Sequence, residues 1–141
     1  MTEGRMIDHQ LRERASRAIS SEESVLTGRI IGSAMVVHKC LGPGFLESIY
    51  QDALEIQFAL DQVDHRREHE IQVPFRGHLL GIQRLDFFVE GAVVVELKAV
   101  SELSSVHRAQ LRSYLKAAGV RIGLLINFNQ ELLQVKRVLN G

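Results

Sequence analysis

The chain has 141 residues, of which 45% are hydrophobic and 24% charged, a composition typical of one globular domain and not of disordered or fibrous proteins. Its formal net charge is zero, which excludes a strong overall attraction to nucleic acid. No apolar run is long enough to span a membrane, and residues 1–17 lack the apolar stretch of a signal peptide. A single cysteine, Cys40, cannot form an internal disulfide, so we expect a cytoplasmic protein without membrane contact.

The charge is distributed unevenly along the chain. Residues 98–141 contain seven lysines or arginines and only two acids, Glu102 and Glu131, whereas residues 1–97 have a net charge of −5. A basic face in this last third would allow phosphate binding even on a neutral protein. Chance segregation of charges on a solvated surface is the alternative interpretation, and the sequence leaves both open.

The chain begins with a polar segment, residues 1–23, interpreted as an amino-terminal arm ahead of a domain spanning residues 24–141. Whether the arm is disordered, a short helix or a partner contact is left open. Apolar residues then recur at helical spacing over residues 24–41, and Gly42-Pro43-Gly44 ends that helix. A second helix is predicted over residues 45–60, with these residues on its buried stripe: Phe45, Ile49, Ala53, Ile56 and Leu60.

Segments rich in β-branched and aromatic residues follow, and they predict strands. These strands are expected over residues 70–75, 79–89, 93–97, 120–126 and 132–139. A further helix is predicted over residues 105–118, closed by Gly119. The predicted order is therefore α-α-β-β-β-α-β-β, an α/β sandwich.

The stretch from Leu85 to Lys98 permits two hairpin registers. A two-residue turn would pair Val89 with Ala92 and place Asp86 and Glu96 on opposite faces. A three-residue loop, Glu90 to Ala92, would instead place Asp86 opposite Glu96. Only this second register gathers the apolar side chains on one face, so we predict it. The gathered residues are Leu85, Phe87, Val89, Val93, Val95 and Leu97.

The other face of that hairpin would carry Asp86, Glu96 and Lys98. Carboxylates opposite each other on neighbouring strands have Cβ atoms about 5 Å apart. Like charges at that separation are unfavourable unless a proton or a cation lies between them. Two hard oxygen donors beside a lysine suit Mg²⁺ or Mn²⁺ better than zinc. Alternatively, Lys98 neutralises the two acids as a salt bridge.

The spacing of Asp86 from Glu96-Leu97-Lys98 resembles the D…(D/E)XK signature of the PD-(D/E)XK, or restriction-endonuclease-like, superfamily. Residues 42–50, GPGFLESIY, are similar to the motif of the GxxExxY (GxxExxR) family of small bacterial and archaeal proteins. The resemblance covers about residues 25–139 and departs at Leu85, where the signature has proline. Further matching segments are VELKAV at 95–100, His107 with Ala109-Gln110, Tyr114-Leu115-Lys116 and GLLINF at 123–128.

The resemblance implies a restriction-endonuclease-like fold with a central mixed sheet, and roles for the matched residues. Asp86 and Glu96 would bind the metal ion, with the backbone carbonyl of Leu97 and the carboxylate of Glu47 as further ligands. Lys98 would orient the attacking water. Gln110 and Tyr114 resemble the QxxxY motif of RecB-like nucleases and, with His107 on the same helical stripe, would contact the substrate.

The implied function is Mg²⁺- or Mn²⁺-dependent hydrolysis of phosphodiester bonds in nucleic acid, DNA in preference to RNA. The alternative is a non-catalytic nucleic-acid-binding or protein-interaction module that keeps the nuclease scaffold. Formation of a homodimer is an expectation at the level of the family.

Overall fold

The computed structural model describes residues 19–140, so most of the predicted arm lies outside the described residues. The order of elements is the predicted one, α-α-β-β-β-α-β-β. The first helix begins earlier than predicted because Ser20 and Glu23 form a capping box at its start. The elements are α2 (Ser21–Leu41), α3 (Glu47–Leu60), β1 (His65–Phe75), β2 (His78–Val89), β3 (Val93–Lys98), α4 (Ser105–Ala118), β4 (Ile122–Asn127) and β5 (Gln134–Leu139).

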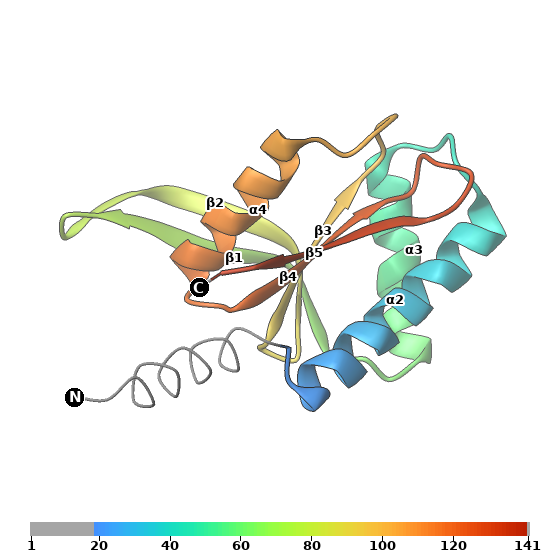
Figure 1. Cartoon of the computed structure of the whole chain (residues 1–141), viewed down its shortest axis with the longest axis horizontal. Coiled ribbons are helices and arrows are strands. Elements are labelled where there is room, and N and C mark those ends of the chain that lie inside the picture. The colour runs from blue at the N-terminus through green and yellow to red at the C-terminus, as the bar shows by residue number, and fades with distance from the viewer. Residues whose placement is uncertain (1–18, 141) are drawn as a thin grey trace, which may run out of the picture.

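The five strands form one mixed sheet in the order β1-β2-β3-β4-β5. The first three strands are an antiparallel meander, β3 runs parallel to β4, and β5 is antiparallel to β4. Figure 1 shows α2 and α3 on one face of the sheet and α4, the connection between β3 and β4, on the other. The fold is thus the predicted α/β sandwich, consistent with a restriction-endonuclease-like fold.

The sheet separates two apolar cores. On the α2–α3 face, Leu54 and Phe58 of α3 pack with residues of the central strands such as Phe87. On the α4 face, Leu111 and Leu115 lie among Val94, Leu125 and Val138. A Cβ on Gly123 of β4 would lie 3.0 Å from a Leu111 methyl carbon, so glycine permits the close approach of α4 to the sheet. No helix within residues 19–140 is both long enough and apolar enough to cross a membrane.

The predicted buried stripe of α3 is wrong. Ile56 and Leu60 are 64% and 71% exposed, and Phe45 and Ile49 are also exposed, whereas Ala53 is half-buried. The helix has two apolar stripes, and the buried one carries its two aromatic residues, which fill more of the core. Its buried residues are Tyr50, Gln51, Leu54 and Phe58.

Tyr50 fixes the glycine turn between α2 and α3. Its hydroxyl donates to the carbonyl of Gly42 at 2.6 Å and accepts the N–H of Phe45 at 3.2 Å. Its ring stacks on Phe128 with 4.6 Å between centroids. Gly42 and Gly44 have φ values of 69° and 109°, which glycine adopts without strain. The turn therefore holds the start of α3 in one place.

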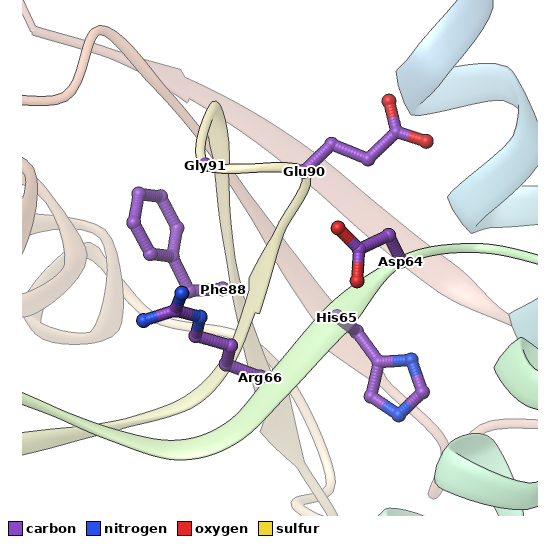
Figure 2. Close-up of a pocket in the computed structure, with 6 residues that line it drawn as sticks. All are labelled: Asp64, His65, Arg66, Phe88, Glu90 and Gly91. Carbon is purple, nitrogen blue, oxygen red and sulfur yellow. The ribbon is translucent and has the colours of Figure 1, made fainter.

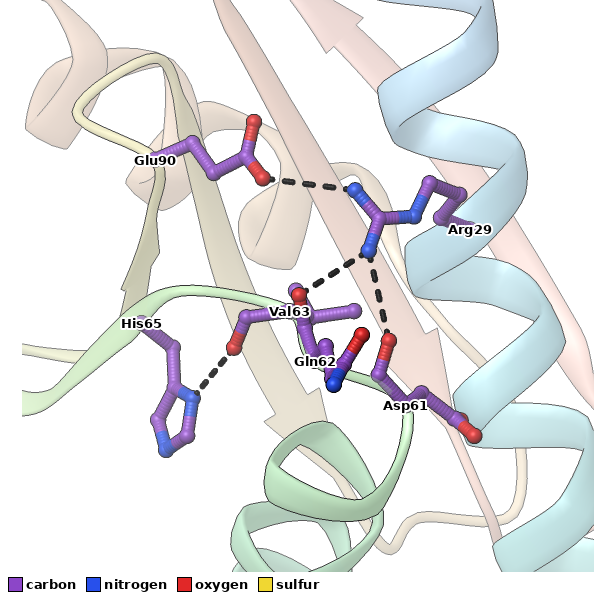
Figure 3. Close-up of polar contacts among 6 residues, drawn as sticks. All are labelled: Arg29, Asp61, Gln62, Val63, His65 and Glu90. Carbon is purple, nitrogen blue, oxygen red and sulfur yellow. Dashed lines mark hydrogen bonds and ion pairs between the residues drawn. The ribbon is translucent and has the colours of Figure 1, made fainter.

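Arg29 of α2 links elements that are distant in sequence, as Figure 3 shows. Its guanidinium donates to the carbonyls of Asp61 and Gln62 after α3, at 3.3 and 3.0 Å. It also donates to Glu90 in the β2–β3 turn, at 3.3 Å. These bonds satisfy carbonyls left free where α3 ends and tie α2 to the hairpin.

We predict that Tyr50→Phe destabilises the protein by about 1–2 kcal/mol, because two backbone groups of the turn lose their partner. Urea unfolding measures the change. Tyr114→Phe is the matched control, since the Tyr114 hydroxyl makes no hydrogen bond to another described residue, and it should cost less. Equal effects of the two substitutions would contradict the role given to the Tyr50 hydroxyl.

Candidate metal centre

The hairpin of β2 and β3 has the predicted register near its turn. Val89 lies opposite Val93, and Phe87 opposite Val95. The loop is the predicted three-residue loop, with Glu90 and Gly91 at φ values of 51° and 64° and the Ala92 N–H bonded to the Val89 carbonyl. The apolar pattern of the two strands therefore identified the correct register.

Backbone pairing stops at Phe87 and Val95, so Asp86 and Glu96 do not form the predicted ladder pair. Their side chains bridge the two strands instead. Asp86 Oδ2 accepts the N–H of Leu97 at 2.7 Å, and Glu96 Oε1 accepts the N–H of Asp86 at 3.0 Å. Carboxylate oxygens thus replace the ladder carbonyls at the point where the strands separate.

The odd-numbered residues of β2 do not all face the same core, which corrects one further prediction. Leu85 was expected on the same face as Phe87, but it lies in the α4 core, whereas Phe87 lies in the α2–α3 core. The other five apolar residues of the predicted face are all in the α2–α3 core. Between Leu85 and Phe87, on either side of Asp86, the odd-numbered side chains of β2 therefore change from the α4 face to the α2–α3 face.

The carboxyl groups of Asp86 and Glu96 lie in a buried site that raises the pKa of both. Glu96 is only 7% exposed. Burial, followed by the charge of Asp86, raises the pKa of Glu96 to about 8. Burial also raises the pKa of Asp86, and the charge of Glu68 adds to that rise. In the absence of a cation, the pair thus retains a proton near neutral pH, as expected for two close carboxylates.

Lys98 and Glu47 lie beside this pair. The charge of Lys98 lowers the pKa of Asp86, of Glu96 and of Glu47, so its ammonium group is close to all three. Glu47 is the first residue of α3. Partial burial, followed by the charge of Asp86, raises its pKa. The glycine turn and β3 therefore bring the predicted acid and lysine to one place.

The predicted substrate-binding residues are distributed differently. Tyr114 is half-buried, and burial followed by the charges of Glu96 and Asp86 raises its pKa, so it borders the carboxyl pair. Gln110, one turn earlier on α4, is exposed. His107 takes part in the capping box of α4, where its Nδ1 accepts the Ser104 N–H at 3.0 Å. Capping accounts for His107 locally, and its contact with substrate stays a prediction.

Two residues of the site were missed by the sequence analysis. Glu68 lies in β1 with a φ of 54°, between the pairs Arg67–Phe87 and His69–Leu85, and therefore opposite Asp86. Gln51 Nε2 donates to Glu68 Oε1 at 2.8 Å and lies 3.5 Å from the Asp86 carbonyl. The signal for Gln51 was its position one helical turn after Glu47. The left-handed conformation of Glu68 has no periodic signature.

The donor chemistry of the pair fits a small divalent cation. No three carboxylate, imidazole or thiol side chains among the described residues converge to hold a metal ion by themselves. Asp86 and Glu96 each use one oxygen for a backbone N–H, which leaves the second oxygen as a possible ligand. Mg²⁺ is commonly bound by one or two carboxylates and completed by water and substrate phosphate. The pair meets that requirement, and the ligand role of Glu47 stays a prediction.

A separate hollow lies at the turn end of the hairpin. Its volume is about 390 Å³, and its lining, drawn in Figure 2, includes Arg66, Phe88 and Glu90 but none of the predicted site residues. The candidate centre is therefore distinct from this hollow and lies where β2 and β3 separate.

The raised pKa of Glu96 predicts a pH dependence of stability. Because its pKa rises from 4.5 to about 8 on folding, its contribution is fully present below 4.5 and is lost as the pH rises through 8. The free energy of unfolding in EDTA should therefore fall with rising pH more for the wild type than for Glu96→Gln. Urea unfolding between pH 4.5 and about 8 measures this difference. Parallel plots of unfolding free energy against pH for the two proteins would contradict a buried Glu96 with a raised pKa.

We also predict that Glu68→Gln lowers the pKa of Asp86, because a neighbouring negative charge is removed while the acceptor for Gln51 is kept. NMR titration of labelled carboxyl carbons measures this pKa. The matched control is Glu70→Gln, which removes an acid of β1 that pairs with Arg84 at 3.5 Å. An Asp86 pKa that responds equally to both substitutions, or to neither, would show that Glu68 does not act on this site.

The chain is similar to known proteins in sequence and in fold. A family model described as the PD-(D/E)XK nuclease superfamily matches residues 24–138. A crystal structure titled SSO0001 has a similar fold, with a TM-score of 0.55 and 19% identity, over 66% of this chain and 49% of that one. At this identity the likeness shows the fold alone, and no curated protein matches the chain. The match over most of its length shows that the chain belongs to the PD-(D/E)XK nuclease superfamily.

Proposed function

We propose that the protein is a divalent-metal-dependent nuclease that hydrolyses phosphodiester bonds, with DNA as substrate in preference to RNA. The observation that carries the proposal is the pair of Asp86 and Glu96, two acids bonded across separating strands with Lys98 beside them. Membership of the nuclease superfamily supports the same reaction. A buried acid pair of this kind needs a proton or a cation, and a cation is the catalytically useful alternative.

Mg²⁺ or Mn²⁺ is the proposed cofactor, held by the carboxylates of Asp86 and Glu96, with the Leu97 carbonyl and Glu47 as further ligands. Such an ion would polarise the phosphate and acidify a water molecule. Glu96 would give up its proton when the cation binds. The hydrogen bonds to the N–H groups of Asp86 and Leu97 fix both carboxylates beforehand, so little reorganisation is needed.

We also assign roles to Lys98, Tyr114, Gln110 and His107, and their positions support these assignments. Lys98 would hold the attacking water through its ammonium hydrogens, since it lies beside all three acids. Tyr114, next to the carboxyl pair, would contact the substrate, with Gln110 and His107 further along the same helical face.

We further propose that the chain is a member of the GxxExxY family. The contacts of Tyr50 support this, because they give the motif a physical purpose: the tyrosine fixes the glycine turn, and the turn places Glu47 near Asp86. Tyr50 is fully buried, whereas Glu47, one helical turn earlier at the start of α3, is exposed and lies close enough to Asp86 for that charge to raise its pKa after burial.

A non-catalytic nucleic-acid-binding or interaction module is the second candidate function. The observation that favours it is the lack of a complete three-ligand cluster among the described residues. In that case the buried acids would keep their shared proton, and Lys98 would serve only to neutralise charge.

Cleavage assays distinguish the two functions. We expect the purified protein to cut plasmid or single-stranded DNA in Mg²⁺ or Mn²⁺, and to cut RNA less. Glu96→Gln and Lys98→Ala should each lower the rate by about 100-fold or more, and EDTA should abolish it. The matched control is Glu131→Gln, which removes an exposed acid of the β4–β5 loop whose charge does not contribute to the pKa shifts of Glu47, Asp86 or Glu96, and it should leave the rate unchanged.

Calorimetric titration with Mn²⁺ completes the test. No cleavage of any substrate, together with no Mn²⁺ binding, would reject the nuclease and leave the interaction module. Cleavage that persists in Glu96→Gln would reject the proposed centre.

A further inference from the structure

Three basic residues form a stripe along α4. Arg108, Arg112 and Lys116 follow one another at intervals of four residues, so they lie along one side of the helix. All three are exposed. In the part of the chain that the structure describes, none of their side chains forms an ion pair or a hydrogen bond. Their charges are therefore free to act on a ligand.

The stripe lies on the opposite side of α4 from the candidate centre. Successive residues differ by roughly 100° around a helix, which places Arg112 roughly 160° from Tyr114. Tyr114 faces Glu96 and Asp86: burial is the main cause of its raised pKa, and the charges of these two acids raise it further. Leu111 and Leu115 form the buried face between the two sides. The basic stripe therefore lies on the side of α4 away from β2 and β3, toward the β5 edge of the sheet; α4 itself packs on β1, β4 and β5.

A fourth cation, Lys136 of β5, lies on the same side. Its neighbour Arg137 donates to Thr27 of α2 at 3.1 Å, so Arg137 points to the α2–α3 face. Side chains alternate along a strand, and Lys136 therefore points to the α4 face, as Val138 does. Lys136 pairs with Leu125, which in turn pairs with Glu96. Lys136 and Glu96 are thus two strands apart, about 10 Å.

These positions account for the uneven charge of the sequence. Of the seven cations in residues 98–141, Lys98 lies in the candidate centre, and Arg121 and Arg137 contact Glu23 and Thr27 of α2. The remaining four gather on one side of α4: Arg108, Arg112, Lys116 and Lys136. This grouping favours a basic face over chance segregation of the charges in this part of the chain.

We infer that these four residues, the basic surface, bind the sugar–phosphate backbone of the nucleic-acid substrate on the β5 side of α4. The inference rests on the proposed function and adds the path of the substrate. A helix is about 10 Å wide, so a backbone that reaches both the basic surface and the acid pair crosses α4. At 3.4 Å per nucleotide this distance corresponds to about three nucleotides. Binding thus requires nucleic acid that extends beyond the cleaved bond.

Salt dependence of binding tests the inference without cleavage. In EDTA and a Glu96→Gln background, anisotropy of a fluorescein-labelled duplex gives the association constant between ~50 and ~200 mM KCl. Four phosphate contacts predict a slope of log K against log salt of about −3.6 for a duplex and −2.8 for a single strand. Arg108→Gln with Arg112→Gln should make the slope shallower by about 1.8, and Lys136→Gln alone by about 0.9.

The matched control is Lys39→Gln with Arg76→Gln, which removes two exposed cations at the end of α2 and at the β1–β2 turn. It should leave the slope unchanged. An unchanged slope in the α4 variants, an equal loss in the control, or no measurable binding to either nucleic acid would each overturn the inference. Thermal unfolding of each variant confirms that these surface changes leave the fold intact.

The outcome is separable from that of the proposed function. Salt-dependent binding lost in the α4 variants, combined with no metal-dependent cleavage in the parent protein, would support the basic surface and reject the nuclease. Metal-dependent cleavage combined with an unchanged salt slope in the α4 variants would support the nuclease and reject the basic surface.

Discussion

The site depends on two hydrogen bonds that cross between β2 and β3. Asp86 accepts the Leu97 N–H, and Glu96 accepts the Asp86 N–H. They end the β2–β3 ladder, since each carboxylate takes an N–H that a strand carbonyl would otherwise accept. Two acids are thereby fixed in a buried place where neither has a full counter-charge. Burial of like charges is costly, and the rise in the pKa of Glu96 to about 8 expresses that cost. Such a site gains most from a cation.

The surrounding elements hold this pair from three sides. The glycine turn, fixed by Tyr50, sets the start of α3 and so the position of Glu47. Gln51, one turn later, bonds to Glu68 on β1. From the other face of the sheet, α4 brings Tyr114 to the pair. Residues from distant parts of the sequence thus converge where the central strands separate, and the separation itself gives them room.

The sequence predicted the order of elements and the hairpin register because both follow from apolar periodicity. Periodicity failed on α3, where two apolar stripes compete and only the core decides that Tyr50, Leu54 and Phe58 are buried. It also failed at Leu85 and Glu68, since a change of face within a strand and a residue at positive φ depend on the tertiary partners that compensate them. His107 was assigned to substrate contact by resemblance, and in the structure its side chain takes part in the capping box of α4.

The most direct test of the central claim is proton release on Mn²⁺ binding, measured by calorimetry at pH 7 in buffers of different ionisation enthalpy. If a cation replaces the proton held by Glu96, wild-type protein should bind Mn²⁺ and release about one proton, whereas Glu96→Gln should release none and bind more weakly. Equal binding and equal proton release in the two proteins would contradict the account, because the metal would then bind elsewhere.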